Sequence, residues 1–473
     1  MDSYSSLIAL QNDVRKGNID LPQLTRQYIS RIDEYKHLNA FVEVFEDEAL
    51  SRAAEVQVRL RSGKAGKLAG LIIGIKDLIC YKDHKVAAGS HILSEYTSIF
   101  SSTVVERLIE ADAIVIGRLN CDEFAMGGSN ENSWFGPVRN FADQTRVSGG
   151  SSGGSAVAVQ AGLCMATLGT DTGGSVRQPA AFCGVVGLKP TYGRVSRHGI
   201  VAYASSFDQV GPITKSIEDA ALILEVIAGA DEYDSTASTV PVPGYSQLLA
   251  RGGKKRIAYL PETLHSEGLD PEVRSMMERS ISQLEKEGHL VEAVSFPYLD
   301  YVVPTYYILT MAESSSNLAR YDGVHYGYRS KNASDLESTY KKSRSEGFGT
   351  EVKRRIMLGT FVLSAGYYDA YYAKAQRVRR LIREKTEEIL KEHDFILLPT
   401  SPGPAFKLGE KTDDPVVMYL ADIFTVQASL AGIPAISLPA AETKEGLPLG
   451  IQLIGKRFGE AELLAFSKEF MEM

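Results

Sequence analysis

The sequence has few of the residues that build metal and disulfide sites. Its 473 residues include only four cysteines, and no two of them form a C-x-x-C pair. This pattern argues against a zinc site and against a redox motif. Because Cys80, Cys121, Cys164 and Cys183 stand among apolar or small residues, we expect free, buried thiols in a reducing compartment.

Long apolar runs and a signal peptide are also missing. No stretch approaches the roughly 18 apolar residues that a membrane-spanning helix needs. The first residues have neither a basic region nor an apolar core, so we expect no secretory signal. The formal net charge of −8 argues against a protein whose whole surface binds nucleic acid, although it leaves room for a local basic patch. We expect a cytoplasmic protein.

Alternating segments indicate an α/β fold. Short apolar runs with β-branched residues predict strands at 68–78, 113–117, 164–168, 256–260, 290–294 and 395–398. Apolar residues at helical spacing predict helices within 5–60 and at 103–111, 155–161, 271–287 and 371–392. We expect a mixed, largely parallel central sheet with helices on both faces. The polar stretch 330–350 is expected to be a loop.

A block of glycine and serine at 148–155 precedes an apolar helix. A flexible linker of this composition would not lie between dense apolar segments. The block lacks the Gly-Lys-Ser/Thr of a Walker motif and the G-x-G-x-x-G of a dinucleotide fingerprint, so it does not predict a nucleotide site. Glycines at a helix start allow backbone N–H groups to converge on a ligand.

A second polar turn, at 169–180, presents Ser175 after a predicted strand. A turn of this kind can display a nucleophile beside converging N–H groups. None of the eight histidines falls in either glycine–serine turn, so a lysine is the alternative base. Lys76 follows a buried apolar run. From the residues alone, it is equally well a strand-end lysine that reaches water or a desolvated base.

Three segments together resemble the amidase signature family: Gly74-Ile75-Lys76-Asp77, GGSSGGS at 149–155, and GTDTGGSVRQPA at 169–180. They occur in the family's order and at fitting spacing, and the match covers nearly the whole chain. The resemblance implies an amidase-signature fold and an amide hydrolase. It implies that Ser175 is the nucleophile, that Ser151 is a bridging serine after a cis peptide bond, and that Lys76 is the base.

The resemblance also assigns the surroundings of the nucleophile. The backbone N–H groups of Thr172, Gly173 and Gly174, with that of Ser175, would hold the oxyanion. Thr170, Asp171 and Arg177 would brace the turn without taking part in the chemistry. The chain would form one domain, 1–473, with an N-terminal helical segment at 1–60, a core at 65–215 and a helical excursion at 300–390 on the substrate side.

Within this family the chain resembles the glutamine-hydrolysing subunits of tRNA-dependent amidotransferases. The segments that carry this likeness include DEFAMG at 122–127, SSNLARYDG at 315–323 and GTEVKRRIMLG at 349–359. By resemblance, Arg355 binds the α-carboxylate of glutamine, Asp422 binds its α-ammonium group, and Tyr306 and Ser129 line the pocket. From the residues alone, Arg355 would be read as a solvated helix face and Asp422 as a carboxylate at a helix start.

The same resemblance predicts partners and cofactors. Ammonia would pass to a B subunit that uses ATP and magnesium to convert Glu-tRNA(Gln) to Gln-tRNA(Gln), and a small C subunit would complete a heterotrimer. This chain itself would need no metal or cofactor, and tRNA would bind mainly through the partner. The basic side chains at 374, 377 and 380 are better explained as a solvated helix face than as RNA contacts. The alternatives are a stand-alone amidase of broad specificity and a non-catalytic assembly protein.

Overall fold

One 11-stranded sheet runs through the described part of the chain, with the strand order β1-β3-β2-β4-β6-β5-β10-β11-β9-β7-β8. The structure is a computed structural model that describes Tyr4 and residues 6–250, 252–266, 268–411 and 415–473. The strands are β1 (Phe41–Val44), β2 (Ile72–Lys76), β3 (Ile114–Leu119), β4 (Ala166–Asp171), β5 (Val186–Lys189), β6 (Gln209–Thr214), β7 (Arg256–Tyr259), β8 (Leu290–Ala293), β9 (Phe395–Pro399), β10 (Ala435–Glu442) and β11 (Pro448–Ile454).

The sheet is mixed, as predicted, but it is less parallel than the sequence indicated. Among the described strands, four pairings are parallel, and they join β2 to β3 and β4, and β7 to β8 and β9. The other six pairings are antiparallel. The expectation of a largely parallel sheet is therefore wrong. The sequence analysis did not recognise β5, β6, β10 and β11, which form the antiparallel middle of the sheet.

Helices surround this sheet. They are α1 (Leu7–Lys16), α2 (Leu21–Glu34), α3 (Glu46–Arg61), α4 (Thr103–Glu110), α5 (Gly153–Gln160), α6 (Arg177–Cys183), α7 (Ile217–Ile227), α8 (Pro261–Leu264), α9 (Pro271–Lys286), α10 (Leu299–Asn317), α11 (Leu336–Gly347), α12 (Thr350–Leu363), α13 (Lys374–Glu392), α14 (Pro415–Leu420), α15 (Val426–Ala431) and α16 (Glu460–Glu472).

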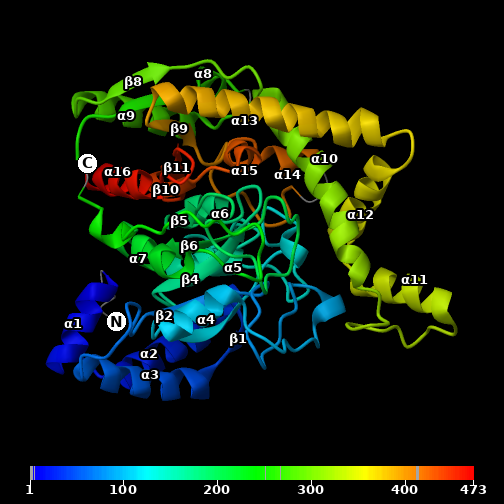
Figure 1. Cartoon of the computed structure of the whole chain (residues 1–473), viewed down its shortest axis with the longest axis horizontal. Helices are drawn as coiled ribbons and strands as arrows, with labels where there is room; N and C mark the ends of the chain where they lie inside the picture. Colours follow the sequence, from blue (N-terminus) through cyan, green and yellow to red (C-terminus); the bar gives the residue numbers. More distant parts are fainter. Residues whose placement is uncertain (1–3, 5, 251, 267, 412–414) are drawn as a thin grey trace.

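Two groups of helices pack on the centre of the sheet. Helices α5 and α6 contact each other and strands β2, β4, β5, β10 and β11, whereas α7 and α16 contact each other and strands β5, β6, β10 and β11. Helix α10 packs against α12 and α13; α10 and α12 lie at the right of Figure 1, whereas α13 runs along its top. The sheet supports the glycine–serine turns, and α10 contacts the second turn through Tyr306.

Two local predictions differ from the structure. The segment 5–60 contains three helices, but also β1, which pairs antiparallel with β3. The stretch 330–350 is not a loop, because it contains α11. Asp335 and Ser338 form a capping box that stabilises the start of this helix. Only Ser343 and Gly347 of α11 are buried, so its sequence shows no apolar periodicity.

The prediction for the cysteines is confirmed. All four cysteines are free and buried. In the described residues, no helix is both long and apolar enough to cross a lipid bilayer. Strands β2 and β4 are buried along their whole length, as their β-branched and apolar residues predict. They lie side by side and run parallel, so their carboxyl ends reach the same edge of the sheet.

Candidate active site

Lys76 ends strand β2 inside the protein and contacts three hydroxyl groups. Its Nζ atom donates hydrogen bonds to Ser151 Oγ at 2.8 Å, Ser152 Oγ at 3.0 Å and Thr170 Oγ1 at 2.8 Å. The side chain is fully buried. Burial lowers the pKa of Lys76 to about 8, because the low-dielectric interior disfavours the charged form. The strand-end lysine that reaches water is therefore excluded, and the geometry fits a base.

The first glycine–serine turn holds Ser151 against Lys76. The peptide bond between Gly150 and Ser151 is cis, in agreement with the family resemblance. Gln178 Oε1 accepts the N–H of Gly150 at 2.9 Å, and the carbonyl oxygen of Ser151 accepts the N–H of Asp122 at 3.2 Å. These backbone contacts orient the Ser151 side chain toward Nζ of the lysine.

The second turn lies beside the first. The N–H of Ser152 donates to the carbonyl oxygen of Ser175 at 3.1 Å, which joins the two turns directly. Ser175 is 8% exposed, whereas Lys76 and Ser151 are 0% exposed, so Ser175 is the member of the three that a substrate can reach. Its hydroxyl forms no hydrogen bond with any residue in the described part of the chain, as the proposed nucleophile requires.

Unpaired N–H groups surround the proposed nucleophile. None of the residues that the structure describes accepts a hydrogen bond from the N–H groups of Gly173, Gly174 or Ser175. Gly174 has φ 142°, a conformation that favours glycine. Thr172 is fixed from its side chain, because Oγ1 donates to Asp208 Oδ1 at 2.7 Å. Fixed donors without a protein partner have the arrangement that an oxyanion hole requires.

A buried ion pair braces this turn. Arg177 donates from Nη2 to Asp171 Oδ1 at 2.8 Å and from Nε to Asp171 Oδ2 at 2.9 Å, and both side chains are fully buried. Burial alone would raise the pKa of Asp171, but the Arg177 guanidinium holds this pKa below its ordinary value. Asp171 also accepts the N–H of Val176 at 3.2 Å. The pair thus fixes both ends of the segment that carries Ser175.

Asp122 and Ser152 belong to the site, although the sequence analysis gave them no role. Asp122 accepts the N–H groups of Asn130 at 3.0 Å and Asn132 at 3.3 Å. Burial raises its pKa to about 6, and its negative charge in turn raises the pKa of Lys76. Asp122 lies in the DEFAMG segment, but nothing in that segment by itself indicates that its charge acts on the lysine.

Arg355 lies on the buried side of α12 and is not the solvated helix face that its local sequence suggested. It is 3% exposed. Its Nε donates to Glu351 Oε1 at 2.8 Å and its Nη1 donates to Tyr203 Oη at 2.9 Å. The guanidinium lies 5.3 Å from the ring centroids of both Tyr307 and Tyr419. Arg355 is thus a buried cation that lies over the faces of two aromatic rings.

Asp422 lies close to this cation. Tyr307 Oη donates to Asp422 Oδ2 at 2.8 Å, so the ring of Tyr307 connects Asp422 to Arg355. Burial raises the pKa of Asp422 to about 7, whereas the hydrogen bond from Tyr307 and the charge of Arg355 oppose this shift. A carboxylate and a guanidinium that share one tyrosine match the two charges of an α-amino acid.

Tyr306 and Ser129 lie against the catalytic turns. A Cβ placed on Gly173 would lie only 2.4 Å from Tyr306 Oη, so the tyrosine packs directly on the oxyanion turn. A Cβ on Gly150 would lie 2.9 Å from the backbone nitrogen of Ser129. The structure therefore brings all four predicted substrate-binding residues to this region of the molecule.

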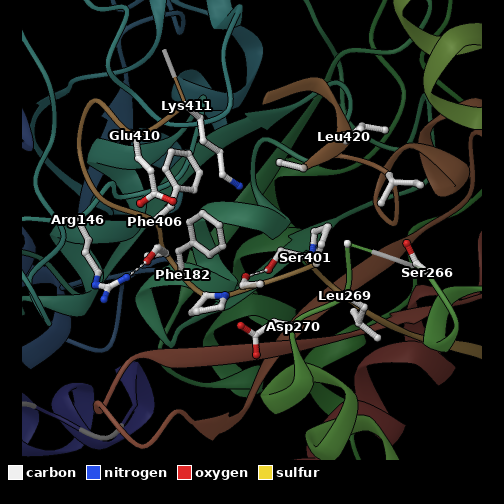
Figure 2. Close-up of a pocket in the computed structure, with 17 residues that line it drawn as sticks. Arg146, Phe182, Ser266, Leu269, Asp270, Ser401, Phe406, Glu410, Lys411 and Leu420 are labelled. Carbon is white, nitrogen blue, oxygen red and sulfur yellow. Dashed lines mark hydrogen bonds between the residues drawn. The ribbon is translucent and has the colours of Figure 1, made fainter. Parts of the chain in front are cut away.

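A cavity of about 520 Å³ lies next to the segment that carries Asp422 (Figure 2). Phe182 of α6 and Leu420 of α14 line it, together with charged side chains that include Arg146 and Lys411. None of the three predicted catalytic residues lines this cavity. Phe182 approaches within 3.0 Å of a Cβ placed on Gly149, so the first glycine–serine turn lies directly behind the cavity wall.

Comparison with known proteins agrees with this geometry. The sequence model of the Amidase family matches residues 23–464. The chain therefore belongs to the amidase family, and it is an enzyme of that family with an α/β fold around a large mixed sheet.

Its relatives are more specific. The chain is 54% identical over 428 residues to the A subunit of the glutamyl-tRNA(Gln) amidotransferase of Koribacter versatilis, covering 90% of this chain and 89% of that one. It is 50% identical over 472 residues to the corresponding protein of Syntrophus aciditrophicus, covering 99% and 97%. The crystal structure of the A subunit of the glutamyl-tRNA(Gln) amidotransferase from Thermotoga maritima superposes with a TM-score of 0.78 at 43% identity, covering 95% of this chain and 90% of that one.

Proposed function

We propose that this chain is the glutamine-hydrolysing component of a tRNA-dependent amidotransferase. The observation that carries the proposal is the hydrogen-bonded cluster of a buried lysine and two serine turns. Lys76 Nζ lies 2.8 Å from Ser151 Oγ, and Ser175 lies on the adjoining turn beside free N–H donors. The similarity to amidotransferase A subunits over nearly the whole chain supports the choice of glutamine as the amide.

The acylation step uses two proton transfers. Neutral Lys76 accepts the proton of Ser151, and Ser151 accepts the proton of Ser175, whose oxygen forms a bond to the amide carbon. The N–H groups of Gly173 and Gly174 hold the negative charge that develops on the carbonyl oxygen, and removing one such donor typically costs about 2.7–4 kcal/mol of transition-state stabilisation.

Collapse of the tetrahedral species breaks the carbon–nitrogen bond. The proton held by Ser151 goes to the leaving nitrogen, which departs as ammonia, and Ser151 recovers a proton from Lys76. Water then attacks the ester on Ser175 by the same route and gives glutamate. Every proton taken from a nucleophile in this sequence is returned, so the chain needs no cofactor for hydrolysis.

Recognition of the α-amino-acid group is assigned to Arg355 and Asp422. The α-carboxylate of glutamine pairs with Arg355 and its α-ammonium group with Asp422, while Tyr306 and Ser129 line the path to Ser175. The shared contact of Arg355 and Asp422 with Tyr307 supports this assignment. A simple amide has neither charge and would gain nothing from the two residues.

The ammonia is not the final product in this proposal. We infer that a B subunit, which holds ATP and magnesium, transfers it to Glu-tRNA(Gln), and that a small C subunit completes a cytoplasmic heterotrimer. Each of the relatives is named as one component of an amidotransferase, which supports a complex of several chains.

Ammonia release from glutamine tests the proposal. The purified chain is assayed alone and with candidate B and C subunits, beside a Ser175→Ala control and a panel of simple amides. Release that requires Ser175 and increases with the partners is the expected result. If simple amides are cleaved while glutamine is untouched in every combination, the chain is a stand-alone amidase. If Ser175→Ala leaves the activity of the complex intact, the chain is a non-catalytic assembly protein.

A further inference from the structure

Glu351 is one of the side chains that surround Arg355, and no role has yet been given to it. Glu351 lies one helical turn before Arg355 on α12. A single oxygen, Oε1, accepts hydrogen bonds from Arg355 Nε at 2.8 Å and from Tyr419 Oη at 2.8 Å. The other oxygen accepts a bond from Arg354. Glu351 thus joins α12 to α14.

The second connection between the same two helices passes through Tyr307 of α10. The rings of Tyr307 and Tyr419 stack with centroids 4.1 Å apart, and Tyr307 Oη holds Asp422 at 2.8 Å. The residues Glu351, Arg355, Tyr307 and Tyr419 therefore connect the proposed carboxylate-binding residue to the segment that carries the proposed ammonium-binding residue. A displacement of Tyr419 would change the position of Asp422 relative to Arg355.

The hydrogen bonds of Arg355 leave one side of its guanidinium available. Glu351 occupies Nε and Tyr203 occupies one hydrogen of Nη1, while Nη2 donates to no residue in the described part of the chain. A guanidinium has five N–H donors. The three that remain are both hydrogens of Nη2 and one of Nη1, and these are donors that a carboxylate can bind.

Glu351 stays ionised in this setting. Its side chain is only 12% exposed. Burial alone would raise the pKa of Glu351, but the Arg355 guanidinium holds this pKa below its ordinary value. The carboxylate is therefore a fixed negative charge that keeps Arg355 in one orientation, because an arginine without such a partner has several free side-chain torsions.

We propose that Glu351 is a positioning residue for the α-amino-acid group of the substrate, which holds Arg355 directly and the Asp422 segment through Tyr419. The inference rests on the proposed function, because it concerns how glutamine is bound. It predicts that Glu351 affects the choice between glutamine and an amide without α-substituents, and that this effect depends on Arg355.

The test compares two substrates in matched variants. The values of kcat and KM are measured for L-glutamine and for butanamide, which has the reacting amide but no α-amino or α-carboxylate group. The variants are Glu351→Gln, which keeps the shape and removes the charge, and Tyr419→Phe, which removes one hydroxyl. Glu384→Gln serves as the control, because Glu384 forms an exposed i, i+4 pair with Arg380 on α13.

In Glu351→Gln we expect the ratio of kcat/KM for glutamine to kcat/KM for butanamide to fall about tenfold, which corresponds to about 1.4 kcal/mol. The loss is expected in KM rather than in kcat. Tyr419→Phe is expected to change the ratio in the same direction by a smaller factor, and the Glu384→Gln control is expected to change neither substrate. Once Arg355 is replaced by Met, the additional change Glu351→Gln is expected to alter the ratio by no more than Tyr419→Phe does, because only the contact through Tyr419 remains.

The results that would contradict this proposal can be told apart from one another. Equal losses for both substrates would assign Glu351 a purely structural role and overturn this proposal, as would a tenfold loss that persists without Arg355. An unchanged ratio in Glu351→Gln overturns this proposal alone if the unmodified chain hydrolyses glutamine. If the unmodified chain hydrolyses butanamide but not glutamine, both this proposal and the proposed function fail.

Discussion

In the proposed mechanism, the protonation of Lys76 determines how the activity depends on pH. The pKa of this buried lysine is lowered to about 8, and only its neutral form can accept a proton. At pH 7 about one tenth of the molecules have neutral Lys76, and at pH 6 about one hundredth. Below pH 8 the value of kcat/KM is therefore expected to fall about tenfold for each pH unit, and above pH 9 it is expected to be constant.

The assay uses ammonia release from butanamide between pH 6 and 9.5 at constant ionic strength. Butanamide is chosen because it has no α-ammonium group and does not require ionised Asp422. Below the midpoint of the profile, the slope of log kcat/KM against pH is expected to be one. A rate that is flat from pH 6 to 9, or that falls as the pH rises through 8, would refute the assignment of Lys76 as the base.

A substitution near the lysine gives an independent check of the same reasoning. The negative charge of Asp122 raises the pKa of Lys76, so Asp122→Asn is expected to move the midpoint of the profile below pH 8 and to increase the rate at pH 7. Lys76→Met is expected to abolish turnover at every pH. A midpoint that stays in place in Asp122→Asn, in a variant that folds normally, would contradict the electrostatic explanation.

Three further predictions follow from the geometry of the site. Because the pKa of Asp422 is about 7, the KM for glutamine is expected to fall as the pH rises through 7, and Asp422→Asn is expected to remove this dependence, as measured by KM at pH 6, 7 and 8. Arg177→Met leaves a buried carboxylate unpaired and is expected to lower the free energy of unfolding in urea by about 3–5 kcal/mol. Gly173→Ala keeps the backbone N–H but places a Cβ 2.4 Å from Tyr306 Oη, so the oxyanion turn or the tyrosine must shift. It is expected to reduce kcat/KM by more than about tenfold, since a displaced oxyanion donor loses part of the about 2.7–4 kcal/mol that it contributes, whereas Gly252→Ala, where a Cβ meets nothing within 4 Å, is expected to leave kcat/KM unchanged.

The sequence predicted those parts of the site that lie within short motifs. Lys76 ends a buried strand, and Ser151 and Ser175 lie in glycine-rich turns, so each has a local signal in the chain. The structure brings them together because strands β2 and β4 are parallel neighbours. The role of each residue stays a prediction until it is tested by substitution.

The contacts of the substrate region could not be predicted in the same way. Glu351 contacts Tyr419, and Tyr307 contacts Asp422, across separations of 68 and 115 residues. No periodicity in the sequence indicates such pairs. The burial of Arg355 was likewise not visible locally, because its neighbours Lys353 and Arg354 give this part of α12 the appearance of a solvated face.

The fold was predicted in outline and not in its pairing. Buried β-branched runs gave β2, β3, β4 and β9 correctly, because such runs are rare outside a sheet core. The sequence does not reveal which strands pair, or in which direction, when the connections between them are long. The strands β5 and β6, which are separated by a long irregular segment, were not recognised in the sequence. Because they pair antiparallel, the sheet is less parallel than expected.

The order of the strands divides the sheet into two halves, which carry different residues of the proposed site. Strands β1 to β6 occupy one side of the sheet and β7 to β11 the other, and the only ladder that joins the two sets, among the strands described, is between β5 and β10. Lys76, Ser151 and Ser175 all belong to the first half, whereas Arg355 and Asp422 belong to the second. The proposed bond-cleaving residues are thus encoded apart from the two residues proposed to bind the charges of the substrate, while Ser129 and Tyr203 of the first half reach across to the substrate side. A redesign of the second half for a new amide would leave the proposed hydrolytic residues in place, provided that these two contacts are kept.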